Sequence, residues 1–213
     1  MTAMTTDFGT RVERALQLHP PRRVGATNER EAAVLIPMYD RDNPTLIFTV
    51  RTDTLPSHKG QISFPGGSID ASDPSPEAAA LREAEEEIGL RRDDVRVVGE
   101  LDTTPTYVSG YVVWPFVGWL ARKPDLRPNP AEVAAVLEVP IAALSDDIRR
   151  EPGFSHNGFT YPTEAWVWED RVIWGVTARL LRLLLQRLGE AGLATPPGPT
   201  KSWDFPPLAS SER

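Results

Sequence analysis

The most informative segment of the chain reads Ala80-Leu-Arg-Glu-Ala-Glu-Glu-Glu-Ile-Gly-Leu90. In a helix each residue turns the chain by about 100°, so three of these glutamates share one face that covers about a third of the circumference. They are Glu83, Glu86 and Glu87. Three carboxylates on one face of a short helix are the first indication of a functional site.

The flanking residues predict where this helix begins and ends. Ser75 is a good N-cap, Pro76 suits the first helical position, and Gly89 suits the end. We therefore expect a helix from about Pro76 to Ile88. The apolar stripe that would anchor it, on roughly the opposite side from the glutamates, consists of Leu81, Ala84 and Ile88.

The acidic face is unfavourable for the helix itself. Carboxylates three and four residues apart repel each other by roughly a few tenths of a kcal/mol per pair, and negative charge late in a helix opposes the macrodipole. A charge run is most often a solvated face, and Glu85-Glu86-Glu87 alone would be interpreted that way. Divalent cations offer the alternative, because Mg²⁺ is usually held by carboxylates together with substrate phosphates.

The segment before the helix favours the metal-binding interpretation. It contains Gly60-Gln-Ile-Ser-Phe-Pro-Gly-Gly67 and the acidic Ser68-Ile-Asp-Ala-Ser-Asp73. Two consecutive glycines permit positive φ angles and a close approach of the backbone to a ligand. A lone Gly-Gly pair would be an ordinary turn, but this pair comes shortly before the glutamates. The carbonyl of Gly67 could therefore complete the coordination shell of an ion.

With these residues the segment resembles the box of the Nudix hydrolases. That box runs Gly, five residues, Glu, seven residues, Arg-Glu, an apolar residue, any residue, Glu-Glu, any residue, Gly and an apolar residue. The second half matches residue by residue from Arg82 to Leu90. The first half departs from the pattern, because Asp73 stands where the family has Glu, and eight residues rather than seven separate it from Arg82.

A second resemblance is to the coenzyme A pyrophosphatase branch of this family. Its signature is similar to Leu46-Ile-Phe-Thr-Val-Arg51, Leu55, His58, Gly60-Gln61 and Phe64-Pro-Gly-Gly67. The longer box with Asp73 is similar to that branch too. The resemblance extends from about residue 30 to residue 188 and includes Asn129-Pro-Ala-Glu-Val133 and Ile173-Trp-Gly-Val-Thr-Ala178.

The resemblance implies a mixed β-sheet between helices, an α/β/α sandwich in which the box forms loop–helix–loop. It implies attack of water on a diphosphate, which for coenzyme A would yield adenosine 3′,5′-bisphosphate and 4′-phosphopantetheine. Mg²⁺ or Mn²⁺ is the implied cofactor, and both suit carboxylate ligands. Two alternatives stay open: a hydrolase of ADP-ribose, NADH or a nucleoside triphosphate, and a non-catalytic nucleotide-sensing module.

The resemblance also implies roles for single residues. The metal ligands would be Glu83, Glu86, Glu87 and Gly67. The catalytic candidates are Glu86, as a ligand or as the base, and Glu132, which stands at a predicted loop-to-strand junction. Candidate substrate-binding residues are Arg51, for a phosphate, and His58 and Gln61, for hydrogen bonds. Structural roles in the box fall to Arg82, Asp73, Gly66 and Gly89, with Arg82 expected to pair with an acidic loop residue such as Asp73.

The composition limits the compartments and partners. The 213 residues include no cysteine, which excludes disulfides, thiolate nucleophiles and cysteine-based metal sites. A net charge of −7 argues against a general nucleic-acid binder, although a bound metal could still attract a small anionic substrate. No apolar stretch reaches the ~20 residues of a membrane helix, and the N-terminus lacks a secretory pattern. We therefore expect a cytoplasmic protein that binds a small nucleotide of the coenzyme A class, and neither nucleic acid nor a membrane. Tryptophan-rich strands and the last helix leave a homodimer open.

The rest of the chain predicts a strand-rich α+β domain. The expected strands are residues 32–38, 45–51, 95–101, 111–120, 133–139 and 165–168, with mostly loop over 55–73. Further helices are expected at 10–18, 141–144 and 172–188. This pattern predicts an N-terminal extension with a short helix (1–29), a Nudix-like domain (30–190) and a Pro-rich flexible tail (191–213).

Overall fold

The computed structural model describes residues 7–24, 30–40, 43–52, 60–106, 110–144, 148–156, 159–169, 171–197 and 201–202, with the backbone alone for 148–156, 159–164, 167 and 201–202. The elements in chain order are α1 (Phe8–Gln17), β1 (Arg30–Asp40), β2 (Pro44–Arg51), β3 (Ile62–Ser63), β4 (Gly66–Ser68), α2 (Pro76–Ile88), η1 (Arg92–Asp94), β5 (Arg96–Glu100), β6 (Thr104–Pro105), β7 (Tyr111–Leu120), β8 (Val133–Pro140), η2 (Ile141–Leu144), β9 (Ile148–His156), β10 (Phe159–Trp168), β11 (Arg171–Trp174), α3 (Gly175–Glu190) and β12 (Lys201–Ser202).

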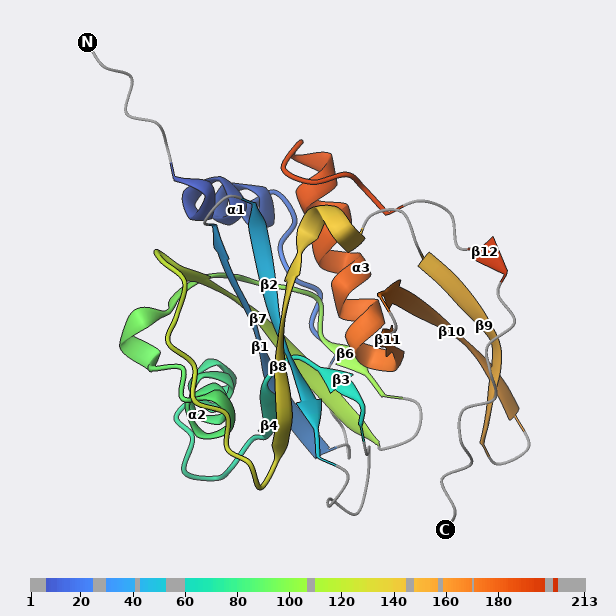
Figure 1. The fold of residues 1–213 in the computed structure, drawn as a ribbon, viewed down its shortest axis with the longest axis horizontal. Helices are drawn as coiled ribbons and strands as arrows, with labels where there is room; N and C mark the ends of the chain where they lie inside the picture. Colours follow the sequence, from blue (N-terminus) through green and yellow to red (C-terminus); the bar gives the residue numbers. More distant parts are fainter. Residues whose placement is uncertain are drawn as a thin grey trace.

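A large mixed sheet forms the centre of the molecule (Figure 1). Within the described residues it has eight strands, in the order β3-β2-β1-β7-β5, with β4 paired to β1, β6 to β7 and β8 to β2. β1 and β7 run parallel over ten residue pairs, from Arg30↔Tyr111 to Tyr39↔Leu120. The neighbouring pairs β1–β2, β2–β8 and β5–β7 are antiparallel. A smaller sheet, β11-β10-β9-β12, lies beside α3.

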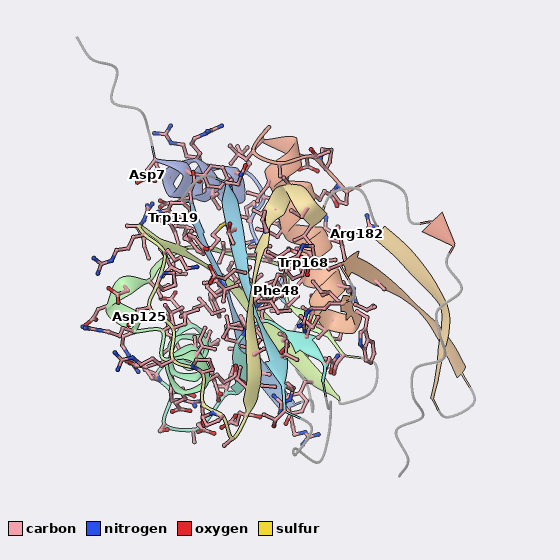
Figure 2. The ribbon with its side chains drawn as sticks, viewed as in Figure 1. Asp7, Phe48, Trp119, Asp125, Trp168 and Arg182 are labelled. Carbon is pink, nitrogen blue, oxygen red and sulfur yellow. The ribbon has the colours of Figure 1, made fainter. Side chains whose placement is uncertain are left out.

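Helices cover both faces of the large sheet. α2 lies on one face and α1 and α3 lie on the other (Figure 1). Alternating residues of β1 face opposite layers, because Leu35 packs with Ile88 of α2 while Ile36 belongs to the cluster that includes Phe48 and α3. Figure 2 shows Phe48 in the middle of the molecule. The predicted α/β/α sandwich with a mixed sheet is confirmed.

The box helix α2 has the predicted bounds, Pro76–Ile88. The Ser75 hydroxyl accepts a hydrogen bond from the Ala78 N–H at 3.1 Å, and Gly89 ends the helix in the left-handed conformation. Ala84 and Ile88 are fully buried, as the apolar stripe predicts. The observed helix and its caps agree with the sequence prediction, because each of these signals is local in the sequence.

α1 begins two residues earlier than expected, at Phe8 rather than Thr10. Asp7 accounts for the difference, because its carboxylate accepts a hydrogen bond from the Thr10 N–H at 2.6 Å and caps the helix. Val12 is buried in the same core as Phe48, and Gly9 packs so closely on Trp119 that a Cβ would collide with the ring. α1 is therefore part of the core around the large sheet, and Figure 2 shows Trp119 beneath it.

The helix expected at 172–188 was placed too early, since α3 spans Gly175–Glu190. The preceding residues form β11, which pairs antiparallel with β10 from Ala165↔Trp174 to Trp168↔Arg171. The apolar run before Gly175 suits a strand as well as a helix, and the hairpin partner decides for the strand. The helix expected at 141–144 is present as the 3₁₀ turn η2.

The segment expected to be mostly loop, 55–73, contains two short strands, β3 and β4. β4 consists of Gly66, Gly67 and Ser68, and it pairs with β1 at Val34↔Gly66 and Ala33↔Gly67. Glycine is a poor strand former, so this pairing leaves no trace in the local sequence. Residues 53–59 of this segment lie outside the described residues.

The other expected strands are confirmed as β1, β2, β5, β7 and β8, and the one at 165–168 is the end of the longer β10. β9 was not predicted. Of the tryptophans in the described residues, Trp119 and Trp166 are buried and Trp114, Trp168 and Trp174 are half-buried. The possible homodimer stays a prediction. The three-part division of the chain stays a prediction. No helix among the described residues is long and apolar enough to cross a membrane.

Candidate active site

Glu87 does not lie on a solvated face of α2. The residue is only 4% exposed, and its carboxylate accepts a hydrogen bond from the backbone N–H of Gly66 in β4 at 3.2 Å. Gly66 has φ +155, and a Cβ at this position would collide with the backbone of β1. The two glycines therefore let the loop press onto β1 and cover Glu87.

Burial raises the pKa of the Glu87 carboxyl to about 7. The Gly66 N–H opposes this change, repulsion from Glu83 adds to it, Arg51 opposes it, and Glu132 adds to it. A carboxylate in this environment is costly to ionise unless a cation joins it. Neither the Gly66 N–H nor the Arg51 guanidinium offsets the effect of burial on Glu87.

Glu83 lies directly against Gly67. A Cβ on Gly67 would come within 2.6–2.7 Å of the Glu83 carboxylate, so glycine is required for this approach. Burial raises the pKa of Glu83 as well, against the hydrogen bond and the charge of Arg82. The candidate metal ligands Glu83 and Gly67, which are distant in the sequence, are thus brought together.

The three glutamates Glu83, Glu86 and Glu87 form an acidic row along α2, and Arg82 lies on its outer side. Its Nε and Nη2 donate to the two oxygens of Asp73, each at 3.0 Å, and its Nη1 donates to Glu83 at 2.9 Å and to Glu86 at 3.0 Å. The Arg82–Asp73 ion pair is the contact that the sequence led us to expect. Hydrogen bonds from Arg82 lower the pKa of Asp73. Asp73 can pair with Arg82 in place of the usual Glu, because the loop that carries it is one residue longer and offsets its shorter side chain.

Arg51 borders the inner side of the row, at the end of β2. Its Nη1 lies 4.0 Å from an oxygen of Glu87, and its side chain is 28% exposed. Its Nε is buried and has no hydrogen-bond partner among the described residues. Buried donors are almost always satisfied in native proteins, so this atom indicates a ligand that supplies an acceptor.

Of the remaining predicted site residues, the structure describes Gln61 and Glu132 but not His58. The backbone carbonyl of Gln61 accepts from the Arg51 N–H at 3.0 Å, and its amide group lies toward Gly175 at the start of α3. Glu132 is half-buried, and its carbonyl accepts from the N–H of Thr52, next to Arg51, at 2.9 Å. Repulsion from Glu132 reaches both Glu83 and Glu87. His58 lies outside the described residues.

A divalent cation fits this donor set. The ligating atoms are oxygens, two of the carboxylates have raised pKa values, and Gly67 brings the backbone against Glu83. In the part of the chain that the structure describes, no three acidic or histidine side chains are arranged to hold an ion as they stand. Glu83 and Glu86 each direct one oxygen at Arg82, and each carboxylate has a second oxygen to offer a cation.

A model of the NUDIX domain matches residues 29–156. The chain belongs to the Nudix family. A relative named "Uncharacterized Nudix hydrolase NudL" from Photorhabdus laumondii subsp. laumondii is 42% identical over 86% of this chain and 97% of its own length. A relative of the same name from Escherichia coli strain SMS-3-5 is 39% identical over 81% of this chain and 90% of its own length.

A Nudix fold is also found among solved structures. The crystal structure of a MutT/nudix family protein from Enterococcus faecalis covers 88% of this chain and 71% of its own, with a TM-score of 0.52 and 12% identity. This likeness concerns the fold alone. The family match and the two relatives establish the chain as a Nudix hydrolase, an enzyme that cleaves the diphosphate bond of a nucleoside diphosphate derivative. Nudix hydrolases generally use divalent ions such as Mg²⁺ or Mn²⁺.

Sequence reasoning missed two features of this Nudix site. The burial of Glu87 depends on Gly66, 21 residues earlier, and helical periodicity carries no information about that contact. The second feature is Asn129, which hydrogen-bonds the backbone of Glu87 and lies next to Glu132. An Asn-Pro pair three residues before a glutamate was the available signal, since it predicts a tight turn.

Proposed function

We propose that this Nudix hydrolase cleaves the diphosphate of coenzyme A or a derivative of it. The observation that carries the proposal is that residues from the two sequence resemblances lie together in one site. The coenzyme A signature supplies Arg51, and the box supplies Glu83, Glu87 and the glycines that contact them, Gly66 and Gly67, which the signature shares. A residue that marks the branch, Arg51, therefore lies beside a residue that marks the chemistry, Glu87, as expected if both act on the same substrate.

The proposed ligands of the ion are Glu83, Glu86, Glu87 and the carbonyl of Gly67. A bound Mg²⁺ or Mn²⁺ would offset the negative charge of the diphosphate and make water more acidic. Arg51 would donate from its unsatisfied Nε to a phosphate oxygen, as a charge-assisted hydrogen bond. Gln61, beside Arg51, and His58 remain proposed contacts to the rest of the substrate.

Glu132 is the better of the two candidates for the base. Glu86 is engaged by Arg82 at 3.0 Å and its side chain is 56% exposed, which suits a ligand at the rim. Glu132 is half-buried and close enough to Glu83 and Glu87 to raise the pKa of both. It would accept the proton of the attacking water as the new P–O bond forms and the bridging P–O bond breaks.

The alternatives differ in their support. A hydrolase of ADP-ribose, NADH or a nucleoside triphosphate would use the same carboxylates and Arg51, and the coenzyme A signature is what favours the first proposal. A nucleotide-sensing module without catalysis is disfavoured, because family membership and the named relatives indicate a hydrolase. It would also have no use for the costly burial of Glu87.

The test is product analysis by chromatography after incubation with Mg²⁺ or Mn²⁺. The substrates are coenzyme A, ADP-ribose, NADH and a nucleoside triphosphate, each with wild type, Glu87→Gln and the matched control Glu85→Gln. Glu85 lies on the same helix and pairs with Arg92, away from the row. We expect adenosine 3′,5′-bisphosphate from coenzyme A with wild type and Glu85→Gln, and on the order of 10³-fold slower release with Glu87→Gln. Turnover of another member alone would contradict the coenzyme A proposal and leave the carboxylate chemistry in place.

A further inference from the structure

We propose that Asn129 is a positioning residue, which fixes the candidate base Glu132 relative to the metal-ligand end of α2. The inference rests on the proposed role of Glu132 and adds the residue that holds it. Asn129 lies in the connection between β7 and β8, and eight residues, 121–128, separate it from Leu120 at the end of β7. It stands between two groups that must keep a fixed separation for the reaction to occur.

The backbone of Asn129 joins both groups. Its N–H donates to the carbonyl of Glu87 at 2.8 Å, so it satisfies a carbonyl in the last turn of α2. Its own carbonyl accepts from the N–H groups of Glu132, at 3.1 Å, and of Val133, at 2.8 Å. Two residues earlier, the N–H of Arg127 donates to the carbonyl of Ile88 at 2.8 Å, which secures the same connection to the helix end.

The side chain of Asn129 shapes the turn and reaches Glu132. Its Oδ1 accepts from the Ala131 N–H at 3.1 Å, an Asx turn. Its Nδ2 donates to Oε1 of Glu132 at 3.5 Å, a long hydrogen bond. The amide thus orients the carboxylate of Glu132, while the Asx turn sets where the Glu132 backbone enters β8.

An amide suits this position better than a charged group would. Glu132 already repels Glu83 and Glu87, and a further carboxylate beside it would drive it away from its position. An asparagine offers one acceptor for the turn and one donor for the carboxylate. Aspartate keeps the acceptor and loses the donor, so Asn129→Asp separates orientation of Glu132 from formation of the turn.

The experiment is a double-mutant cycle on metal-dependent turnover of coenzyme A, or of ADP-ribose if product analysis selects it. The variants are Asn129→Asp, Glu132→Gln and the two combined. We expect Asn129→Asp to lower kcat about 10- to 100-fold with KM nearly unchanged, as for residues that orient catalytic groups. In the Glu132→Gln background the same change should cost less than about twofold, because the glutamine amide can donate to the aspartate.

Two further variants isolate the structural contribution. Asn129→Ala removes the Asx turn as well, and a fall in its thermal unfolding midpoint that Asn129→Asp does not share would assign the turn to Oδ1. Asn43→Asp makes the same chemical change at an exposed turn before β2, where the side chain is remote from the described site, and should leave kcat unchanged.

The outcomes are distinguishable. An equal loss from Asn129→Asp in both backgrounds, or a raised KM with unchanged kcat, would overturn the positioning role and leave Glu132 as the base. Full turnover by Glu132→Gln alone would overturn the assignment of the base and this inference with it.

Discussion

Two arginines border the carboxylates of α2, and their environments are opposite. Arg82, on the outer side, donates to Asp73, Glu83 and Glu86 at 2.9–3.0 Å. Arg51, on the inner side, has a buried Nε without a partner among the described residues, and it lies 4.0 Å from Glu87. A satisfied network stabilises a fold by itself, whereas an unsatisfied one needs a ligand. We therefore propose that the outer side of the row acts as scaffold and that the inner side binds the substrate and the ion.

The largest expected effect comes from removing the buried carboxylate of the inner side. Glu87→Gln should lower kcat on the order of 10³-fold, about 4 kcal/mol of transition-state stabilisation, because a proposed metal ligand is lost. Steady-state kinetics at saturating Mg²⁺ measure it, with Glu85→Gln as the matched control. Wild-type turnover in Glu87→Gln would contradict the assignment of the inner side as the metal site.

The second effect is a pH dependence of stability in the metal-free protein. The folded-state pKa of Glu87 is about 7, above the value of about 4.3 in an unfolded chain. The unfolded state therefore loses its proton first, and stability falls as pH rises from about 4.5 to 7, by up to roughly 3 kcal/mol. Urea unfolding in EDTA at several pH values measures this, and Glu87→Gln should remove the slope.

Asp73 should act with the opposite sign and so sharpen the comparison. Hydrogen bonds from Arg82 lower its pKa in the folded state, so its contribution is present above the unfolded value and lost as pH falls. Asp73→Asn should weaken the acid branch of the same stability profile and leave the branch between pH 4.5 and 7 in place. Loss of both branches in one variant would contradict the separation of the two sides.

The third effect tests Arg51 without changing its charge. Arg51→Lys removes the buried Nε donor, and kcat/KM should fall roughly 10- to 100-fold, the range of a charged hydrogen bond to a phosphate. The thermal unfolding midpoint should stay near that of wild type, because Nε has no hydrogen-bond partner to lose among the described residues. Arg91→Lys, at a surface position 70% exposed, is the matched control. A large loss of stability without loss of kcat/KM would make Arg51 a scaffold residue instead.

The smallest effect on turnover is expected from Arg82→Lys, which should lower kcat about tenfold or less while the thermal unfolding midpoint falls by several degrees. A lysine cannot reproduce the paired hydrogen bonds to Asp73. Arg96→Lys is the control, since Arg96 also contacts two carboxylates, Asp7 and Glu13, but on the surface. A midpoint as high as wild type would show that the Arg82 network does not hold the box.

Local signals predicted the parts of the fold that local signals control. Ser75 and Gly89 predicted the bounds of α2, and the apolar run of residues 111–120 predicted β7 to the residue. The errors fell where a distant partner decides, as for β11, which pairs with β10, and for β4, which pairs with β1. The site follows the same rule. Its carboxylates could be named from helical spacing, but the burial of Glu87 and the contacts of Asn129 come from segments 21 and 42 positions away in the chain.

The parallel pairing of β1 with β7 has a consequence for the order in which the protein assembles. It joins residues about 80 positions apart, such as Arg30 and Tyr111, and contacts of that range form late in folding. The hydrogen bonds of α2 are local and can begin to form earlier, while Glu87 is still hydrated, and the carboxylate loses that water when β4 packs against it. The repulsion of Glu87 by Glu83 and Glu132 therefore becomes strong only near the end of folding. We expect a bound divalent ion to slow unfolding more than it accelerates folding, so that the ion acts on how long each molecule stays folded.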